Sequence, residues 1–510
     1  MNIAILILIA FYASLLTFIL VYSFVQASLV MNYLRFHRNK AKTEEPETKV
    51  LTEFPFITVQ LPVYNEKYVV ERLIDSIAAL DYPKSRLEIQ VLDDSTDETV
   101  DIARSKVNEL SQNGVRISHI YRSNRVGYKA GALDEGLKIA KGEFIVIFDS
   151  DFLPNPEFLQ MTIPHFEDER IGVVQTRWEH LNREYSWLTR LQAFGLDAHF
   201  SIEQTGRNAG GHFINFNGTA GVWRKKCIED AGGWSADTLT EDLDLSYRAQ
   251  LRGWKFSYLE NVGSPAELPA LIDALKTQQF RWTKGAAECA RKNLKKVLVS
   301  DEISLSTKVH SVFHLMNSFL FVCIALSAII SIPLLFIKTI TPDLDWLFKL
   351  GSVFMTSFVI LAWFYAVSFF KRLPGTVKST FDFLITFPLF LAVSMGLSLH
   401  NSIAVVEGYL GIKSPFIRTP KMNLVNKSDD WNGNNYLASK ISVLTIFEGL
   451  LMLYFIMGIY LGIHFGDYGL MPFHIMLSVG FGYVFFSTII QSKSIRGNSH
   501  SPLESKIVGV

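Results

Sequence analysis

Acidic side chains stand at the ends of expected strands, which makes them candidates for chemistry. Asp93 and Asp94 close the run EIQVLDD, and Asp149 and Asp151 close the run FIVIFDSD. Two carboxylates spaced by one residue at a strand end offer hard oxygen ligands to a divalent ion, which can bridge the phosphates of a nucleotide. We therefore predict a metal site at Asp149 and Asp151. The alternative for any such pair is a solvated turn or a helix N-cap.

A further acidic group is the tripeptide TED, which ends at Asp242 and precedes the helix-like run LDLSYRAQLRGW. As a functional group, Asp242 would be a general base that takes a proton from an attacking hydroxyl. The tripeptide alone favours the alternative, in which Thr240 caps a helix and the carboxylates complement its dipole.

The run QQFRW, from Gln278 to Trp282, combines a cation with an aromatic ring. Arg281 offers a planar donor fork for a diphosphate, and Trp282 offers an apolar face on which a sugar ring can stack. An amphipathic helix at a membrane surface is a second, compatible interpretation. Upstream, the glycine-containing run NRVGYKAGALDEG offers Arg125 and Lys129 to phosphate oxygens, although basic loops are commonly just solvated.

These residues lie in a region, 53–300, that reads as one α/β domain. Short β-branched or aromatic runs alternate with helical stretches, and this alternation predicts a doubly wound, mainly parallel sheet with its ligands beyond the carboxyl ends of the strands. No GxxxxGK[ST] loop is present, and no GxGxxG follows the first strand, which disfavours P-loop and dinucleotide-binding enzymes. The strands are expected from residues 56, 88, 115, 144 and 171, and helices at 69–79, 98–112, 129–141 and 156–166.

The composition sets this domain in a membrane protein. The chain has 510 residues, 49 basic and 49 acidic side chains, 49% hydrophobic residues and only 19% charged residues. A neutral chain gives no argument for nucleic-acid binding. The three cysteines, Cys227, Cys289 and Cys323, are far apart and support neither a disulfide framework nor a zinc site.

Apolar runs predict where the chain crosses the bilayer. Residues 1–33 carry no charge and form an expected N-terminal anchor, followed by a linker at 34–52. A membrane domain at 301–492 has four predicted spans, at 309–337, 347–370, 441–465 and 470–491, and a tail at 493–510 ends the chain. By the positive-inside rule, the basic residues beside the spans predict that the segments carrying them and the α/β domain at 53–300 face the cytoplasm. The N-terminus is then expected outside.

The stretch 381–410 is apolar enough to span but is interrupted by His400, Asn401 and Glu407. If it crossed once, the basic segments before and after it would lie on opposite sides. We therefore predict a re-entrant or interface helix, which keeps both segments inside. The alternative is an ordinary sixth span.

Taken in order, PVYNE, LDDSTDET, FDSD, FNGTAGVWR, TED and QQFRW resemble the family 2 glycosyltransferases, specifically the processive membrane β-glycan synthases. The segment 212–282 is most similar to the plant cellulose-synthase-like A and C enzymes, which make mannan, glucomannan and a glucan backbone. These usually carry VED where this chain has TED, so the sugar stays open.

The resemblance implies roles for individual residues. The base would be Asp242, with Glu241 its neighbour, and Asp149 and Asp151 would hold nucleotide and Mg2+ or Mn2+. The implied donor-binding residues are Tyr64, Glu66, Asp93, Asp94, Lys129, Asp149, Gln278 and Arg281, and the acceptor residues are Asn217, Gly218, Thr219 and Trp282.

A loop at 413–427 contains FIRTPK, which is similar to the FxVTxK gating loop of cellulose synthases. The matching residues are Phe416, Thr419 and Lys421. The loop departs from the family by Arg418 in place of the usual valine and by Pro420.

The resemblance implies an inverting transferase that uses a nucleotide hexose, of the UDP-glucose or GDP-mannose class, to extend and export a β-linked polysaccharide. An accessory subunit is compatible with it, in a cell membrane or a Golgi membrane. One alternative is a transferase that adds one hexose to a lipid. Another is a transporter or receptor with an inactive nucleotide-binding domain, for which Glu407 and Glu448 would be the intramembrane charges.

Overall fold

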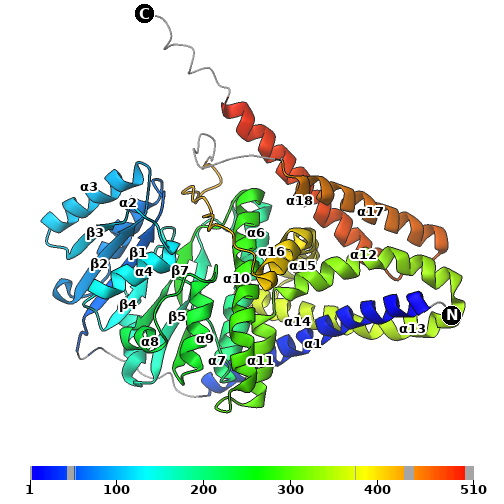
Figure 1. Ribbon diagram of the computed structural model, residues 1–510, viewed down its shortest axis with the longest axis horizontal. Coiled ribbons are helices and arrows are strands. Elements are labelled where there is room, and N and C mark those ends of the chain that lie inside the picture. Colours follow the sequence, from blue (N-terminus) through cyan, green and yellow to red (C-terminus); the bar gives the residue numbers. More distant parts are fainter. Residues whose placement is uncertain (1–2, 43–50, 52, 374, 430–440, 500–510) are drawn as a thin grey trace, which may run out of the picture.

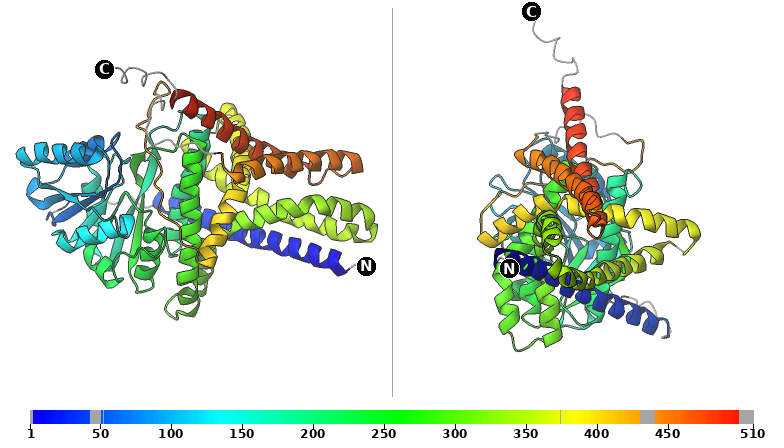
Figure 2. Two further views of the ribbon diagram at one scale, coloured as in Figure 1. Left: turned by 45° about the horizontal axis from the view of Figure 1, so that its top comes forward. Right: turned by 90° about the vertical axis from the view of Figure 1, so that its right-hand side faces the viewer.

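An α/β region and a set of long apolar helices make up the protein, and the helices extend from one side of that region (Figures 1 and 2). The computed structural model describes residues 3–42, 51, 53–373, 375–429 and 441–499. Much of the predicted linker, 43–50 and 52, and the end of the predicted tail, 500–510, lie outside the described residues.

One sheet forms the centre of the α/β region, with the strand order β3-β2-β1-β4-β6-β5-β7. Every neighbouring pair is parallel except those of β6, which runs antiparallel to β4 and β5. The predicted mainly parallel sheet is confirmed, but β6 and β7 were not among the predicted strands. The strands are β1 (Ile57–Val63), β2 (Leu87–Asp93), β3 (Ile117–Tyr121), β4 (Phe144–Ile147), β5 (Ile171–His180), β6 (Gly221–Arg224) and β7 (Lys255–Ala266).

Apolar periodicity explains the helices that cover the sheet. In α2 (Val70–Ala78) the buried residues Val70, Leu73, Ile74 and Ile77 form one stripe, as an amphipathic helix requires. The other predicted helices appear as α3 (Thr99–Gln112), α4 (Tyr128–Ile139) and the short α5 (Phe158–Thr162), which continues into a 3-10 turn.

The sheet order creates a switch point at β1. The chain goes from β1 to β2 and β3 on one side, and then returns to β4 on the other side. The loops that leave the carboxyl ends of β1 and β4 therefore diverge and leave a crevice between them.

Later helices connect the sheet to the membrane segments. The helix α9 (Glu241–Gln250) follows β6, and the long α10 (Ile272–Val299) stands between the sheet and the apolar helices (Figure 1). The remaining helices of this region are α6 (Trp187–Ala198), η3 (His199–Glu203), α7 (Gln204–Ala209), α8 (Lys225–Asp230) and α11 (Leu305–Leu315).

Within the described residues, six helices are long and apolar enough to cross a membrane, which indicates an integral membrane protein. The span predicted at 309–337 begins only at Phe319, because α11 is a separate helix that packs on α10. The last helix continues to Ser499, past the predicted start of the tail. The six are α1 (Ile3–Lys40), α12 (Phe319–Ile340), the segment Trp346–Arg372 that ends in α14 (Met355–Arg372), α15 (Val377–Gly396), α17 (Val443–Phe465) and α18 (Met471–Ser499).

The stretch 381–410 forms two helices, α15 and α16 (Ser398–Leu410), which are separated at Leu397. Length and composition alone would let α15 cross a membrane. It also contacts α6 of the α/β region, while α16 packs along α10, as interface helices would. The interface position of 381–410 stays a prediction.

Candidate active site

A pocket opens at the carboxyl ends of β1 and β4, the crevice that the sheet order creates. It brings together side chains that are far apart in the sequence and includes most of the predicted site residues. Its lining includes Tyr64, Glu66, Asp94, Arg125, Lys129, Asp149, Asp151, Trp178, Asn217, Gly218, Glu241, Asp242, Gln278, Arg281, Trp282, Phe416, Arg418, Thr419 and Lys421.

The two aspartates after β4 are each held by a lysine. Lys129 Nζ donates to Asp149 Oδ1 at 2.5 Å, and Lys421 Nζ donates to Asp151 Oδ2 at 2.7 Å. Burial favours the neutral form of both lysines, but the neighbouring carboxylates outweigh it and raise the pKa of each amine. Both lysines are therefore positively charged beside the carboxylates that they bind.

The same carboxylates fit a divalent ion. Asp151 Oδ1 is buried and has no hydrogen-bond partner among the described residues, so it is free to coordinate. No cluster of three or more metal-ligating side chains occurs in the described part of the chain. The protein would therefore supply hard carboxylate oxygens, and the remaining ligands would come from a bound diphosphate or from water.

The adjacent residues Asp93 and Asp94 have different surroundings. Asp93 is fully buried and away from the pocket, and its carboxylate accepts bonds from His119 Nε2 and from the Ser95 amide, both at 2.8 Å. Asp94 lines the pocket and accepts both prongs of Arg122, at 2.7 and 2.5 Å. Of the predicted pair, only Asp94 lies where a nucleotide could reach it.

The loop after β1 presents Tyr64 and Glu66 to the pocket. Asn65 between them has φ +53°, and its backbone amide donates to Ser95 Oγ at 2.8 Å, which fixes the turn. Burial raises the pKa of Glu66 to about 8, although Arg418 and Lys421 oppose the shift. Arg125 stacks on the Tyr64 ring, with its guanidinium carbon 3.3 Å from the ring centroid.

Glu241 and Asp242 form the first turn of α9 and face the pocket. Burial raises the pKa of both, that of Asp242 to about 7, with the Glu241 charge adding to the shift and Lys129 opposing it. The Thr240 side chain makes no capping hydrogen bond; its hydroxyl lies 3.4 Å from Cys289 Sγ instead. Thr240 is thus at the N-cap position with acidic residues in the first turn, as the capping alternative requires, but its side chain does not cap the helix.

The FNGTAG loop passes directly beside Asp242. Gly218 has φ +78°, and a β-carbon there would lie 3.0 Å from Asp242 Oδ2, so this approach requires glycine. Asn217 lines the pocket, and its buried Nδ2 has no partner among the described residues. Thr219 is buried outside the pocket lining and accepts the Asp149 amide at 2.9 Å, so it positions Asp149 and does not face an acceptor.

The residues of the run QQFRW lie on α10 and face the same pocket as Asp149 and Asp151. Gln278, Arg281 and Trp282 all line the pocket. Arg281 Nη2 donates to Thr419 Oγ1 at 2.9 Å, while its Nε has no partner among the described residues. Trp282 lies with its ring centroid 6.4 Å from that of Trp178, so two aromatic rings lie close together in the pocket lining.

The loop predicted at 413–427 contributes Phe416, Arg418, Thr419 and Lys421 to the lining of this pocket. Phe416 stacks on Tyr128 with ring centroids 5.7 Å apart, and the Arg281 guanidinium lies over the Phe416 ring, 4.6 Å from its centroid. Arg418 Nη1 lies 3.3 Å from Glu66 Oε2, so the residue that departs from the family pattern forms an ion pair inside the pocket. Glu267 anchors the end of the loop by accepting the amides of Met422 and Asn423.

Other residues of the pocket lining were not among the predicted site residues, and Trp178 and Arg418 are two whose side chains can contact a ligand. Trp178 lies two residues past the predicted strand run IGVVQT and within the observed β5, so an aromatic residue just past a predicted strand was a usable signal. Arg418 was identified only as a departure from the family pattern, and only the fold shows that it lines the pocket. Arg125, which the sequence offered to phosphate oxygens beside Lys129, also lines the pocket.

Chemically, the pocket combines a base, a diphosphate-binding set and an aromatic floor. Asp242 has a pKa suited to taking a proton near neutral pH. The cations of the lining can hold a negatively charged leaving group, and a divalent ion bound at the two carboxylates would add to that positive charge. Trp178 and Trp282 offer faces on which a sugar ring can stack.

The sequence of this α/β region is similar to that of known proteins. Residues 55–285 match the family model described as "Glycosyltransferase like family 2". The chain is 38% identical over 313 residues to "Glucomannan 4-beta-mannosyltransferase 1" of Oryza sativa subsp. japonica, covering 59% of this chain and 60% of that protein. It is 40% identical over 294 residues to "Glucomannan 4-beta-mannosyltransferase 7" of Arabidopsis thaliana, covering 55% and 53%.

Each of these matches spans less than two thirds of the relative's length. Among solved structures, a mannosyltransferase of Pyrobaculum calidifontis in complex with GDP-Man and Mn2+ aligns with a TM-score of 0.48 and 17% identity, over 78% of this chain and 99% of that one.

Proposed function

Residues 55–285 match the glycosyltransferase-like family 2 model, and from this premise we propose that the chain is a membrane-embedded, inverting hexosyltransferase that extends a β-linked polysaccharide. The proposed donor is GDP-mannose, because the curated relatives are named as glucomannan 4-β-mannosyltransferases. UDP-glucose is the second donor to be tested.

One observation carries the proposal. A single pocket brings Asp242 together with Asp149 and Asp151 and with Arg281 and Trp282. A single-displacement transfer needs a base, a site that binds the diphosphate of the donor, and a surface that orients the acceptor sugar.

In this mechanism Asp242 takes the proton from an acceptor hydroxyl as that oxygen attacks the anomeric carbon of the donor. The bond to the nucleoside diphosphate breaks on the opposite face, which inverts the configuration. Arg281, Lys129 and Lys421 stabilise the charge that develops on the diphosphate, and Trp282 orients the acceptor sugar. When bound at Asp149 and Asp151, Mg2+ or Mn2+ would neutralise part of the same charge.

The membrane helices support a polymer product. Five predicted crossings and the predicted interface segment 381–410 are more than anchoring requires, and we propose that the apolar helices enclose the path by which the glycan leaves. The catalytic region would face the cytoplasm and the N-terminus the outside, because the basic residues that flank the apolar helices follow the positive-inside rule.

The charge arrangement disfavours a transporter with an inactive domain. Glu448 accepts a bond from Lys276 at 2.8 Å and Glu407 from Lys284 at 2.7 Å, and both lysines belong to α10. The acidic residues proposed as a transport path are thus neutralised by structural partners.

The test is to incubate purified membranes with labelled GDP-mannose or UDP-glucose, with Mg2+, with Mn2+, or with a chelator. We expect polymer from GDP-mannose, β-linkages in the product and loss of synthesis with the chelator. One sugar on a lipid would establish the non-processive alternative. Nucleotide binding without any hydrolysis or transfer would refute the enzyme.

A further inference from the structure

Asp244 lies two residues after the proposed base, on the opposite side of α9. Successive residues of a helix are turned by about 100°, so side chains two apart point about 200° from each other. Asp242 faces the pocket, whereas Asp244 is fully buried and faces α10.

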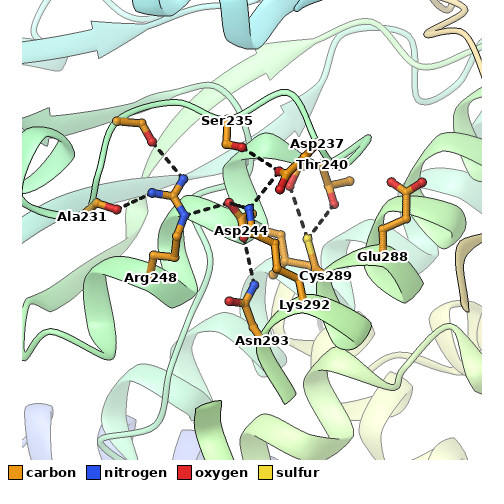
Figure 3. A network of polar contacts seen from close by, with 12 residues as sticks. Ala231, Ser235, Asp237, Thr240, Asp244, Arg248, Glu288, Cys289, Lys292 and Asn293 are labelled. Carbon is orange, nitrogen blue, oxygen red and sulfur yellow. Dashed lines mark hydrogen bonds and ion pairs between the residues drawn. The ribbon is translucent and has the colours of Figure 1, made fainter. Parts of the chain in front are cut away.

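This buried carboxylate has donors from two helices, and they converge on it (Figure 3). Arg248 Nε and Lys292 Nζ donate to Asp244 Oδ2 at 2.8 and 2.9 Å, and Asn293 Nδ2 donates to Oδ1 at 2.9 Å. Lys292 also donates to Asp237 Oδ1 at 2.8 Å. Lys292 therefore joins both ends of the segment 237–244, which carries the base.

One face of α10 holds the rest of that segment. The Leu239 amide donates to Glu288 Oε2 at 2.7 Å, and Thr240 lies against Cys289. A β-carbon on Gly285 would lie 2.5 Å from Thr240 Cγ2, so the two backbones are in close contact there. The α10 residues that make these contacts, 285, 288–289 and 292–293, are three to four positions apart and therefore lie on one face of the helix.

The same helix carries the groups that bind the other reactants. Arg281 and Trp282 precede Lys292 by about three turns, which is roughly 16 Å along the axis at 1.5 Å per residue. Lys292 is therefore too far from the pocket to touch a donor or acceptor. Any effect it has on transfer must act through the placement of α9 on α10.

We propose that Asp244 and Lys292 are positioning residues, whose ion pair fixes the start of α9 on α10 and so sets Asp242 against Arg281 and Trp282. The inference rests on the proposed function for the role of Asp242. A displacement of a reacting group by about 1 Å costs on the order of 100-fold in rate, which makes such a brace consequential.

The ion pair between Asp244 and Lys292 can be weakened without removing the other hydrogen bonds of Asp244. The Lys292 side chain is 24% exposed, and in Lys292→Met the buried Asp244 keeps Arg248 and Asn293 as partners. Lys292→Arg restores the charge. Lys295→Met removes the same charge from an exposed position one turn along and serves as the matched control.

The experiment measures transfer from GDP-mannose and amide hydrogen exchange of residues 237–245 in full-length protein. For Lys292→Met we expect kcat to fall by roughly 10- to 100-fold with the donor KM nearly unchanged, and exchange in this segment to quicken. Lys292→Arg should recover most of both, and Lys295→Met should match the wild type.

Equal behaviour of Lys292→Met and Lys295→Met would overturn the inference, as would a loss that appears in the donor KM instead of kcat. If the wild-type protein transfers no sugar from GDP-mannose or UDP-glucose, the proposed function fails. The exchange comparison still judges the brace in that case: unchanged exchange in Lys292→Met refutes it.

Discussion

Asp242 combines burial with an ionisable neighbour, and both raise its pKa toward neutrality. A carboxylate of this kind is a stronger base than an ordinary aspartate and is still ionised in much of the population near pH 7. The close approach of Gly218 leaves the oxygen Oδ2 facing the pocket and limits the room around it.

Replacing Asp242 by Asn should remove the base while keeping its size. We expect transfer to fall by about 100- to 10,000-fold, the usual range for a general base, with nucleotide affinity retained. Single-turnover assays and nucleotide titration would separate the two. Asp101→Asn, at an exposed position of α3, is the control, and substantial turnover by Asp242→Asn would show that another group takes the proton.

The pH dependence follows from the same residue. Below a pKa of about 7 Asp242 is protonated and cannot accept a proton, so kcat/KM should rise with pH and level off above that value. A pH profile of kcat/KM for the wild type tests this. A profile that falls through pH 7 would contradict the assignment.

Adjacent acidic residues also show what the sequence could not resolve. Both Asp93 and Asp94 were predicted to bind the donor, since both close the same strand. Only the partners of each side chain distinguish them: His119 and Ser95 use both oxygens of Asp93, while Asp94 reaches the pocket. The sequence cannot show which of the two adjacent aspartates, Asp93 or Asp94, a side chain of β3 will bind.

At the scale of elements, the loop at 413–427 is held by aromatic and cationic contacts. Phe416 stacks on the Tyr128 ring and lies against the Arg281 guanidinium, and Thr419 accepts a bond from Arg281. The loop therefore shares Arg281 with the proposed diphosphate site, so we expect its position to depend on that of the donor.

Phe416→Ala should loosen this loop. We expect the donor KM to rise several-fold, because a loop that no longer covers the site holds the nucleotide less well. Steady-state kinetics against donor concentration measures it. Ile417→Ala, at an exposed neighbouring position, is the matched control, and equal effects of both changes would rule out a specific role for Phe416.

Elements differed in how well the sequence predicted them. The first five strands follow β-branched runs bounded by turns and were predicted. The strand β6 has only four residues, GVWR, and pairs antiparallel at the centre of the sheet, so it lacks both the length and the crossover helix that mark a parallel strand. The strand β7 contains Gly263 and Pro265 and has register shifts against β5, which obscure its pattern.

At the scale of the whole molecule, α10 connects the catalytic region to the apolar helices. Its Lys276 donates to Glu448 of α17 and to Thr488 of α18, and its Lys284 donates to Glu407 of α16. Lys276 and Glu448 are both buried, with 10% and 0% of the side chains exposed.

Breaking this pair should destabilise the membrane assembly. Either Lys276→Met or Glu448→Leu leaves an uncompensated buried charge, which costs about 3–5 kcal/mol. Thermal unfolding in detergent measures the loss. The double variant Lys276→Met/Glu448→Leu should recover much of the stability, and additive losses would show that the two residues do not act as a pair.

The run of contacts along α10 also limits how its gene can change. Membrane partners meet it at Lys276 and Lys284, the pocket at Arg281, and the base segment at Lys292. A single inserted codon between these points would turn everything beyond it by about 100° and separate the pocket from one of its neighbours. We therefore expect related proteins to lack insertions and deletions within this helix, whereas residues at its exposed positions should vary.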